Sequence, residues 1–100
     1  MYNGGRVRKA TWPVSYKIHL TRQAEKDLHR LDKATERRVL ARLKELAPNP
    51  YDRRISKMVI MSETERASRV GKWRIVYEID ETNRTLEILS IDPRERAYSF

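Results

Sequence analysis

The spacing of hydrophobic side chains predicts a short strand and then a helix where regular patterning begins. Tyr16, Ile18 and Leu20 alternate with polar residues, which is the period of a half-buried strand. Thr21 follows in the position of a helix N-cap. Apolar side chains then recur at helical spacing over residues 22–31, with charged residues on the other side. We therefore expect a strand followed by an amphipathic helix.

A second amphipathic helix is expected directly after the first. Asp32 is a suitable N-cap, and Pro48 and Pro50 end the helix because proline lacks the N–H group that the helix needs. The apolar positions form one stripe, made of Val39, Leu40, Leu43, Leu46 and Ala47. The two helices are therefore expected to form a hairpin with one apolar side.

The second half of the chain is strand-like. Four strands are predicted, over residues 55–62, 66–70, 73–80 and 85–91, the last ended by Pro93. Short turns at 71–72 and 81–83 separate the last three strands, and Asn83 suits a positive φ. The order β-α-α-β-β-β-β predicts an α+β domain. It has an N-terminal strand, a two-helix hairpin that covers one face, and an antiparallel four-strand segment.

Composition and charge point to a polyanionic partner. The chain has 100 residues, and residues 1–14 lack a periodic pattern, so we expect a flexible leader and a single domain over 15–100. Lys and Arg number 22 against 14 Asp and Glu, which gives a net charge of +8. A small domain this basic often meets nucleic acid, a ribosome, an anionic membrane or an acidic partner. A merely basic surface is the alternative.

Several other classes are disfavoured by what the sequence lacks. No apolar run approaches the ~20 residues of a membrane span, and the basic N-terminus has no apolar segment of a secretory signal. Cysteine is absent, which excludes disulfides and thiolate metal sites and fits a reducing cytoplasm. The only histidines, His19 and His29, lie on different predicted elements, and there is no phosphate-cradling glycine loop. We therefore predict no metal and no cofactor.

The segment SRVGKWRIVYEID carries the first candidate chemistry. Glycine at the first position of the two-residue loop 71–72 is the signature of a type II′ hairpin. Val70 then pairs with Trp73, and Arg69 lies directly opposite Arg74 on the same face. Like charges in this relation are unfavourable, by roughly 0.2–1 kcal/mol.

Three arrangements could compensate this arginine pair. Glu78 lies on the same face and could neutralise one arginine, or both guanidiniums could point apart into solvent. The third is a bound phosphate, which arginine holds in a bidentate fork. Four cations and no acid lie in the stretch 66–77: Arg66, Arg69, Lys72 and Arg74. The phosphate site and the solvated edge stay equal alternatives at this point.

Alternation within the strand 73–80 separates two roles. Odd positions are expected to face the core: Trp73, Ile75, Tyr77 and Ile79. Even positions, Arg74 among them, are expected to face a partner.

The C-terminal segment SIDPRERAYSF adds more cations and aromatic residues: Arg94, Arg96, Tyr98 and Phe100. If the last strand lies beside the strand 73–80, this segment can bring Arg94 and Tyr98 over the arginine face. Arginines stabilise a pentavalent oxyanionic transition state, and a tyrosine can stack on a base or orient a hydroxyl. Tyr98 and Phe100 could instead plug the end of the core, and for Phe100 we favour that role.

These motifs together resemble the RelE/ParE toxin superfamily of bacterial and archaeal toxin–antitoxin modules. The likeness covers residues 16–98 and is carried by AEKDLHRLD, LKELAPNPY, RVGKWRIVYEID and IDPRERAY. It implies a RelE-like fold and a cytoplasmic endoribonuclease toxin that cuts mRNA in the ribosomal A site, with the 2′-hydroxyl attacking the adjacent phosphate. It also implies three partners, which are a cognate antitoxin, the ribosome and mRNA, and no membrane. A heterotetramer or larger complex with the antitoxin is one form the assembly could take.

The resemblance also assigns candidate catalytic residues. Arg74 matches the family's active-site arginine after Gly-x-aromatic, and Arg69 matches the arginine that opens that motif. Arg94 matches the arginine of the terminal motif. Tyr98 is the best match to the terminal tyrosine, with Phe100 competing for the position.

The chain departs from the family pattern on the strand before the hairpin. Active relatives have two lysines there, and the corresponding positions in this chain are Glu65 and Ala67. The expected RNA-binding residues are Arg66, Lys72, Lys57 and Arg96, of which the first three are candidates to replace the lysines. The departure keeps open a ParE-like toxin that inhibits DNA gyrase and cuts no RNA. A basic nucleic-acid-binding module without toxicity is the third interpretation.

Overall fold

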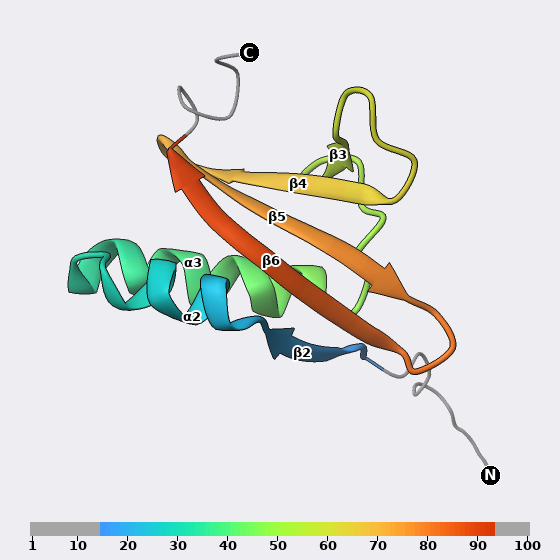
Figure 1. Ribbon diagram of the computed structural model, residues 1–100, viewed down its shortest axis with the longest axis horizontal. Helices are drawn as coiled ribbons and strands as arrows, with labels where there is room; N and C mark the ends of the chain where they lie inside the picture. The colour runs from blue at the N-terminus through green and yellow to red at the C-terminus, as the bar shows by residue number, and fades with distance from the viewer. Residues whose placement is uncertain (1–14, 94–100) are drawn as a thin grey trace, which may run out of the picture.

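The computed structural model describes residues 15–93, and the predicted leader 1–14 and the candidates Arg94, Arg96, Tyr98 and Phe100 lie outside the described residues (Figure 1). Its elements, in chain order, are β2 Lys17–Leu20, α2 Arg22–His29, α3 Lys33–Leu46, β3 Lys57–Met58, β4 Glu65–Val70, β5 Trp73–Asp80 and β6 Thr85–Pro93. The predicted order β-α-α-β-β-β-β and the α+β class are confirmed.

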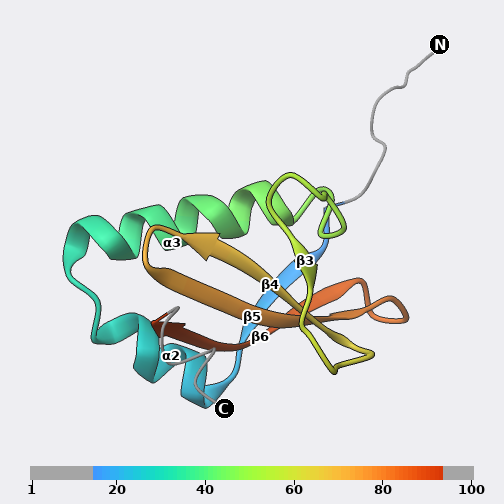
Figure 2. The same cartoon turned by 90° about the horizontal axis from the view of Figure 1, so that it is seen from above.

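The strands form one mixed sheet in the order β2-β6-β5-β4-β3. The pairs β3–β4, β4–β5 and β5–β6 are antiparallel, whereas the pair β2–β6 is parallel. The parallel pair arises because the chain crosses between β2 and the later strands through the two helices. Both helices lie on one side of the sheet in Figure 1, and Figure 2 shows α3 running beside the β4–β5 hairpin. No helix within residues 15–93 has the length and apolar character needed to cross a membrane.

The two helices begin at the predicted caps. The Thr21 side chain accepts a hydrogen bond from Ala24 N at 3.1 Å, and Asp32 accepts one from Thr35 N at 3.3 Å. These bonds satisfy amide groups that have no partner within the helix. α2 ends at His29, two residues before the predicted end, because the next amides bond back three residues rather than four.

The core lies between the helices and the sheet. Its most deeply buried side chains include Val39 and Leu46 of α3, Ile75 and Tyr77 of β5, and Leu86 and Ile88 of β6. Trp73 and Ile79 pack against this cluster while staying partly exposed, so the odd positions of β5 do face the core. Two residues of the predicted apolar faces stay at the surface: Ile18 on the edge strand β2, and Leu40 on the outer flank of α3.

The predicted strand 55–62 is wrong in length, because only Lys57–Met58 pairs with β4. The chain turns directly afterwards. Ser62 N donates to Val59 O at 3.1 Å, and Met61 adopts a φ of 70°. The Ile, Met and Val residues of this run therefore form a loop, because the chain has to reverse direction between β3 and β4. In the 81–83 turn the positive φ falls on Arg84 rather than on Asn83.

A β-bulge in β6 reverses the alternation of its side chains. Tyr77 pairs with Ile88 and Val76 pairs with Ser90, which leaves Leu89 as the extra residue. Ile88 and Ile91 therefore both face the core although they are three positions apart.

The start of α2 holds this bulge in place. Thr21 N donates to Ile88 O at 3.0 Å, and Thr21 Oγ1 donates to Leu89 O at 3.1 Å. The buried Asp27 accepts a hydrogen bond from Ile91 N at 2.9 Å. The bulge also turns Asp92 toward the face that carries Arg74, whose Cα partner it is.

Candidate functional site

The β4–β5 hairpin has the predicted register. Val70 pairs with Trp73, and Arg69 pairs with Arg74. Gly71 has a φ of 60°, as a type II′ turn requires at its first central residue. A Cβ at position 71 would lie 3.1 Å from Arg38 Nη2, so a larger residue would also push this guanidinium aside.

This register brings the two arginines close together. In a two-residue hairpin the pair that closes the loop is hydrogen-bonded, so the next pair is of the non-hydrogen-bonded type, with Cα atoms about 4.5 Å apart. Arg74 is buried, with 8% of its surface exposed, whereas Arg69 is exposed. The sheet therefore presents two guanidiniums on one face, one embedded and one at the surface.

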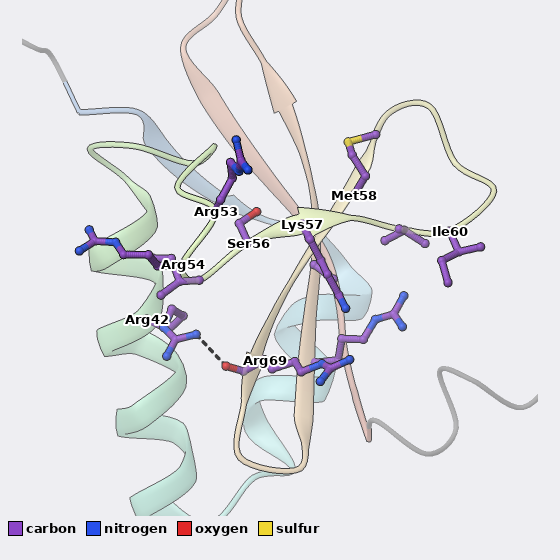
Figure 3. Close-up of a pocket in the computed structure, with 12 residues that line it drawn as sticks. Arg42, Arg53, Arg54, Ser56, Lys57, Met58, Ile60 and Arg69 are labelled. Carbon is purple, nitrogen blue, oxygen red and sulfur yellow. Dashed lines mark hydrogen bonds between the residues drawn. The ribbon is translucent and has the colours of Figure 1, made fainter.

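A pocket of about 330 Å³ opens beside this pair (Figure 3). Half of its twelve lining residues are cations: Arg42, Arg53, Arg54, Lys57, Arg69 and Arg74. The other half are Ile55, Ser56, Met58, Val59, Ile60 and Ala67, so no carboxylate from residues 15–93 lines the pocket. Low-dielectric walls with charge of one sign concentrate the field, and such a pocket attracts an anion.

Arg54 and Arg42 each form an ion pair with a carboxylate outside the lining. Arg54 Nη2 lies 2.8 Å from Asp52 Oδ2, and its hydrogen bonds lower the pKa of Asp52 to about 2. Arg42 Nε lies 2.9 Å from Glu45 Oε1. Each pair has one exposed partner, Arg54 in the first and Glu45 in the second, so solvent weakens both interactions.

Arg42 also braces the hairpin. Its Nη1 donates to Ser68 Oγ at 2.8 Å and to the Arg69 carbonyl at 2.7 Å (Figure 3). The helix α3 thus fixes the strand from which Arg69 projects.

The structure brings some of the predicted RNA-binding residues to this pocket and not others. Lys57 lines it, and its side chain points toward Arg69 in Figure 3. Arg66 lies on the opposite face of the sheet, since its Cα partner is the core residue Tyr77, and its Nε donates to Ser56 Oγ at 2.8 Å. Lys72 is exposed at the hairpin turn and is not among the lining residues.

The last described residue lies beside the arginine pair. β6 ends at Pro93, whose Cα partner is Trp73 at the hairpin turn. The C-terminal candidates Arg94, Arg96 and Tyr98 lie outside the described residues.

Three lining arginines were missed from the sequence: Arg42, Arg53 and Arg54. Arg42 lies on the predicted second helix with no local signal to single it out, and its contacts with β4 place it at the pocket. The adjacent pair Arg53 and Arg54, in the segment between Pro50 and the next strand, was a signal that could have been used.

Glu78 does not neutralise the arginine pair in the way considered from the sequence. It accepts a hydrogen bond from Thr64 Oγ1 at 2.8 Å, and its Cα partners are Glu65 and Glu87. His19 Nδ1 lies 2.6 Å from Glu87 Oε1. The Glu78 end of this face thus carries three glutamates, whereas the Arg74 end carries two arginines and one carboxylate, that of Asp92. No group of three or more His, Asp or Glu side chains within residues 15–93 is suited to hold a metal ion.

Known structures share this fold. The chain resembles the toxin–antitoxin complex RelBE2 of Mycobacterium tuberculosis, with 30% identity and a TM-score of 0.71 over 81% of this chain and 100% of that chain. It resembles the RelE–RelB complex of Pyrococcus horikoshii, with 24% identity and a TM-score of 0.71 over 83% and 99%. An arginine double mutant of Escherichia coli toxin RelE in the free state is 15% identical, with a TM-score of 0.72 over 85% and 92%. The fold is that of a RelE-like toxin.

The sequence comparison gives the family. A family model described as the ParE toxin of the type II toxin–antitoxin system parDE matches residues 18–98. The chain therefore belongs to the ParE toxin family of the RelE/ParE superfamily, and is a toxin of a type II toxin–antitoxin system. A comparison with curated proteins finds no match.

Proposed function

We propose that this toxin is a ribosome-dependent endoribonuclease that cuts mRNA in the A site. The observation that carries the proposal is the pocket to which residues 15–93 contribute six cations and no carboxylate, among them the register-fixed pair Arg69 and Arg74. Such a site fits a phosphodiester. In the proposed reaction the 2′-hydroxyl attacks the adjacent phosphorus, the bond to the 5′-oxygen breaks, and a cyclic phosphate forms.

The arginine pair has the main role in this proposal. Arg69 and Arg74 hold the non-bridging oxygens of the scissile phosphate in bidentate fashion and stabilise the charge that develops on them. Arginine suits this role because its guanidinium stays charged. We further propose that Arg94 and Tyr98 complete the site, with Arg94 on the phosphate and Tyr98 stacking on a base or orienting a hydroxyl.

Lys57 is the best candidate to replace the lysines that this chain lacks. Its Cα partner on the neighbouring strand is Ala67, one of the two positions where the family pattern has lysine. Residues directly opposite on paired strands point to the same face, so Lys57 supplies a cation beside the place where a lysine at 67 would lie. Lys72 and Arg96 would extend the RNA contact. Arg66, on the other face, would touch RNA only outside the pocket.

The partners follow from the same proposal. The ribosome presents the mRNA in the cytoplasm, and a cognate antitoxin silences the toxin. The M. tuberculosis and P. horikoshii relatives were solved as complexes with their antitoxins. We propose an assembly with the antitoxin of heterotetramer size or larger, with acidic side chains of the antitoxin against the basic face.

Cleavage in a purified translation system tests the proposal. Wild-type protein should produce discrete breaks in mRNA bound to ribosomes with an open A site, mapped by primer extension. The same mRNA without ribosomes should stay intact. Ribosome-bound mRNA that survives at toxin concentrations sufficient to arrest growth would show that the enzyme proposal is wrong.

A ParE-like inhibitor of DNA gyrase is the second candidate. Two observations favour it: the family model that matches is that of ParE, and Glu65 and Ala67 replace the expected lysines. Glu65 lies in the acidic end of the sheet face, opposite Glu78. A supercoiling assay with purified gyrase distinguishes the candidates, because the endoribonuclease leaves supercoiling unchanged at concentrations that cut mRNA.

A further inference from the structure

We propose that the apolar wall of the cationic pocket, formed by Val59 and Ile60, is a nucleobase subsite. Ile60 is its principal contact. The inference rests on the proposed function, and it assigns a position to the base attached to the bound phosphate. The subsite takes one nucleotide unit of single-stranded RNA.

Ile60 is an exposed hydrophobic residue in a specific place. Its side chain is 81% exposed, yet it lines the pocket together with the cations. Figure 3 shows Ile60 on the same side of the β3 segment as the Lys57 side chain, whereas Met58 points to the other side. A flat apolar ligand group next to a bound anion would therefore cover Ile60.

Hydrogen bonds hold the backbone of the loop that carries Ile60. Val59 N donates to Glu65 O at 2.9 Å, which joins the two ends of the loop. Glu65 N donates to the side-chain oxygen Ser62 Oγ at 2.9 Å. The backbone that carries Ile60 is thus held before a ligand binds, which reduces the entropic cost of binding.

The size of the pocket favours a nucleotide over a protein segment. About 330 Å³ is at the low end for small-ligand sites, and an amphipathic helix would need a longer groove. A nucleotide combines an anion and an apolar flat face within one small unit. Proteins commonly hold single-stranded bases between aromatic or apolar side chains, beside cations that bind the backbone.

The chemistry of the wall also predicts its selectivity. The side chains of Val59 and Ile60 have no hydrogen-bonding atoms, so they cannot distinguish bases by their donor and acceptor pattern. Their contribution to binding depends instead on the apolar area that the base buries against them. A purine, with its larger face, should therefore bind somewhat more tightly than a pyrimidine.

A binding experiment with matched oligonucleotides tests the subsite. The probes are short 2′-O-methyl RNA strands, which cannot be cleaved, with either a base or an abasic residue at one central position. Fluorescence anisotropy is measured for full-length wild-type protein, Ile60→Ala and Met61→Ala. Met61 is the control because it is adjacent, 99% exposed and not among the lining residues.

For wild-type protein the base-containing strand should bind about fivefold more tightly than the abasic strand, as expected for burial of a modest apolar area. Ile60→Ala should remove most of that difference, and Met61→Ala should keep it. Thermal unfolding should be the same for all three proteins.

Other outcomes overturn the inference, and they separate it from the proposed function. Equal, salt-dependent binding of both strands by wild-type protein would reject the base subsite and leave the phosphate site standing. No binding of either strand would reject both. If Ile60→Ala weakened binding of the antitoxin and left both strands unaffected, the wall would be a protein contact instead.

Discussion

The two ends of β5 carry charged clusters of different composition. At the Trp73 end lies the pocket, whose lining among residues 15–93 has six cations and no carboxylate. Beyond the Asp80 end, Glu81 accepts hydrogen bonds from Tyr16 at 2.8 and 2.9 Å, from Tyr51, and from Arg84 at 3.2 Å. We call the second group, Tyr16, Tyr51, Glu81 and Arg84, the Glu81 cluster.

The difference indicates different roles. In the Glu81 cluster the Arg84 guanidinium also lies over the Tyr16 ring, 4.2 Å from its centre, so the cluster's charges meet partners within the protein. It joins the residue before β2, the segment after α3 and the β5–β6 turn. The pocket gathers six cations around one open space, which an anionic ligand can enter. We expect changes in the pocket to affect activity and changes in the Glu81 cluster to affect stability.

The largest expected effect is the loss of activity on changing Arg74. Arg74→Lys keeps the charge and loses the planar bidentate fork, so single-turnover cleavage of ribosome-bound mRNA should slow by about 10²–10³-fold, as for loss of a transition-state donor. The matched control is Arg84→Lys in the Glu81 cluster, which should cut at the wild-type rate. Equal rates for both variants would mean that the pocket is not the active site.

The next effect concerns affinity at Lys57. Lys57→Ala should weaken binding of uncleavable RNA and reduce the slope of log K against log salt by about 1, as for one lost phosphate contact. Lys72→Ala, outside the pocket lining, should change the slope less. Binding is measured by titration at several salt concentrations. An unchanged slope for Lys57→Ala would remove Lys57 from the RNA contact.

Changing the Glu81 cluster should affect stability without affecting catalysis. Tyr16→Phe removes a hydroxyl that bonds Glu81, at a cost of about 1 kcal/mol. For a domain of this size that lowers Tm by about 4–8 °C. Cleavage at 25 °C per folded molecule should equal that of wild type. A variant with unchanged Tm would show that the cluster contributes nothing to the stability of the fold.

The smallest expected effect is on the pH dependence of stability. The hydrogen bond to Glu81 raises the pKa of Tyr51 from 10.0 to about 12. A raised folded-state pKa stabilises the protein below pH 10, and this contribution is lost as the pH rises from 10 toward 12. The bond to Tyr51 is likewise the main cause of the lowered pKa of Glu81, whose contribution is present above its usual 4.5 and lost below it.

Glu81→Gln should therefore flatten both limbs of the Tm–pH curve. Thermal unfolding from pH 3 to 11 measures this. Arg54→Gln at the pocket rim is the control for the alkaline limb, which it should leave as in wild type. Alkaline limbs that coincide for wild type and Glu81→Gln would contradict the link to Tyr51.

Local rules were enough to predict much of the fold and the register that pairs the two candidate arginines. Thr21 and Asp32 cap helices because their side chains can reach nearby amides. Gly71 sets the hairpin register, and the register alone places Arg69 opposite Arg74. Alternation from that point assigns Ile75 and Tyr77 to the core.

The features that the sequence did not predict depend on contacts between distant segments. The carbonyl of the extra residue Leu89 accepts a hydrogen bond from Thr21, which is 68 positions away in the chain. No local sequence pattern therefore indicates the bulge. Arg42 reaches the pocket only because α3 packs beside β4. The run from Ile55 to Ser62 has the composition of a strand, but the chain has to turn within it to reach β4. Composition does not indicate the residue at which the strand ends.

The hydrogen bond from Arg42 to the Arg69 carbonyl has a consequence for self-association of this protein. β3 pairs only with Arg66 and Ala67, so within the described residues the end of β4 has no strand on its outer side. Unpaired strand edges invite other chains to add a strand and start aggregates. Arg42 occupies an acceptor on that edge and sets a positive charge beside it. The protein can thus keep a short β3, and the open pocket beside it, without turning that edge into a template for aggregation.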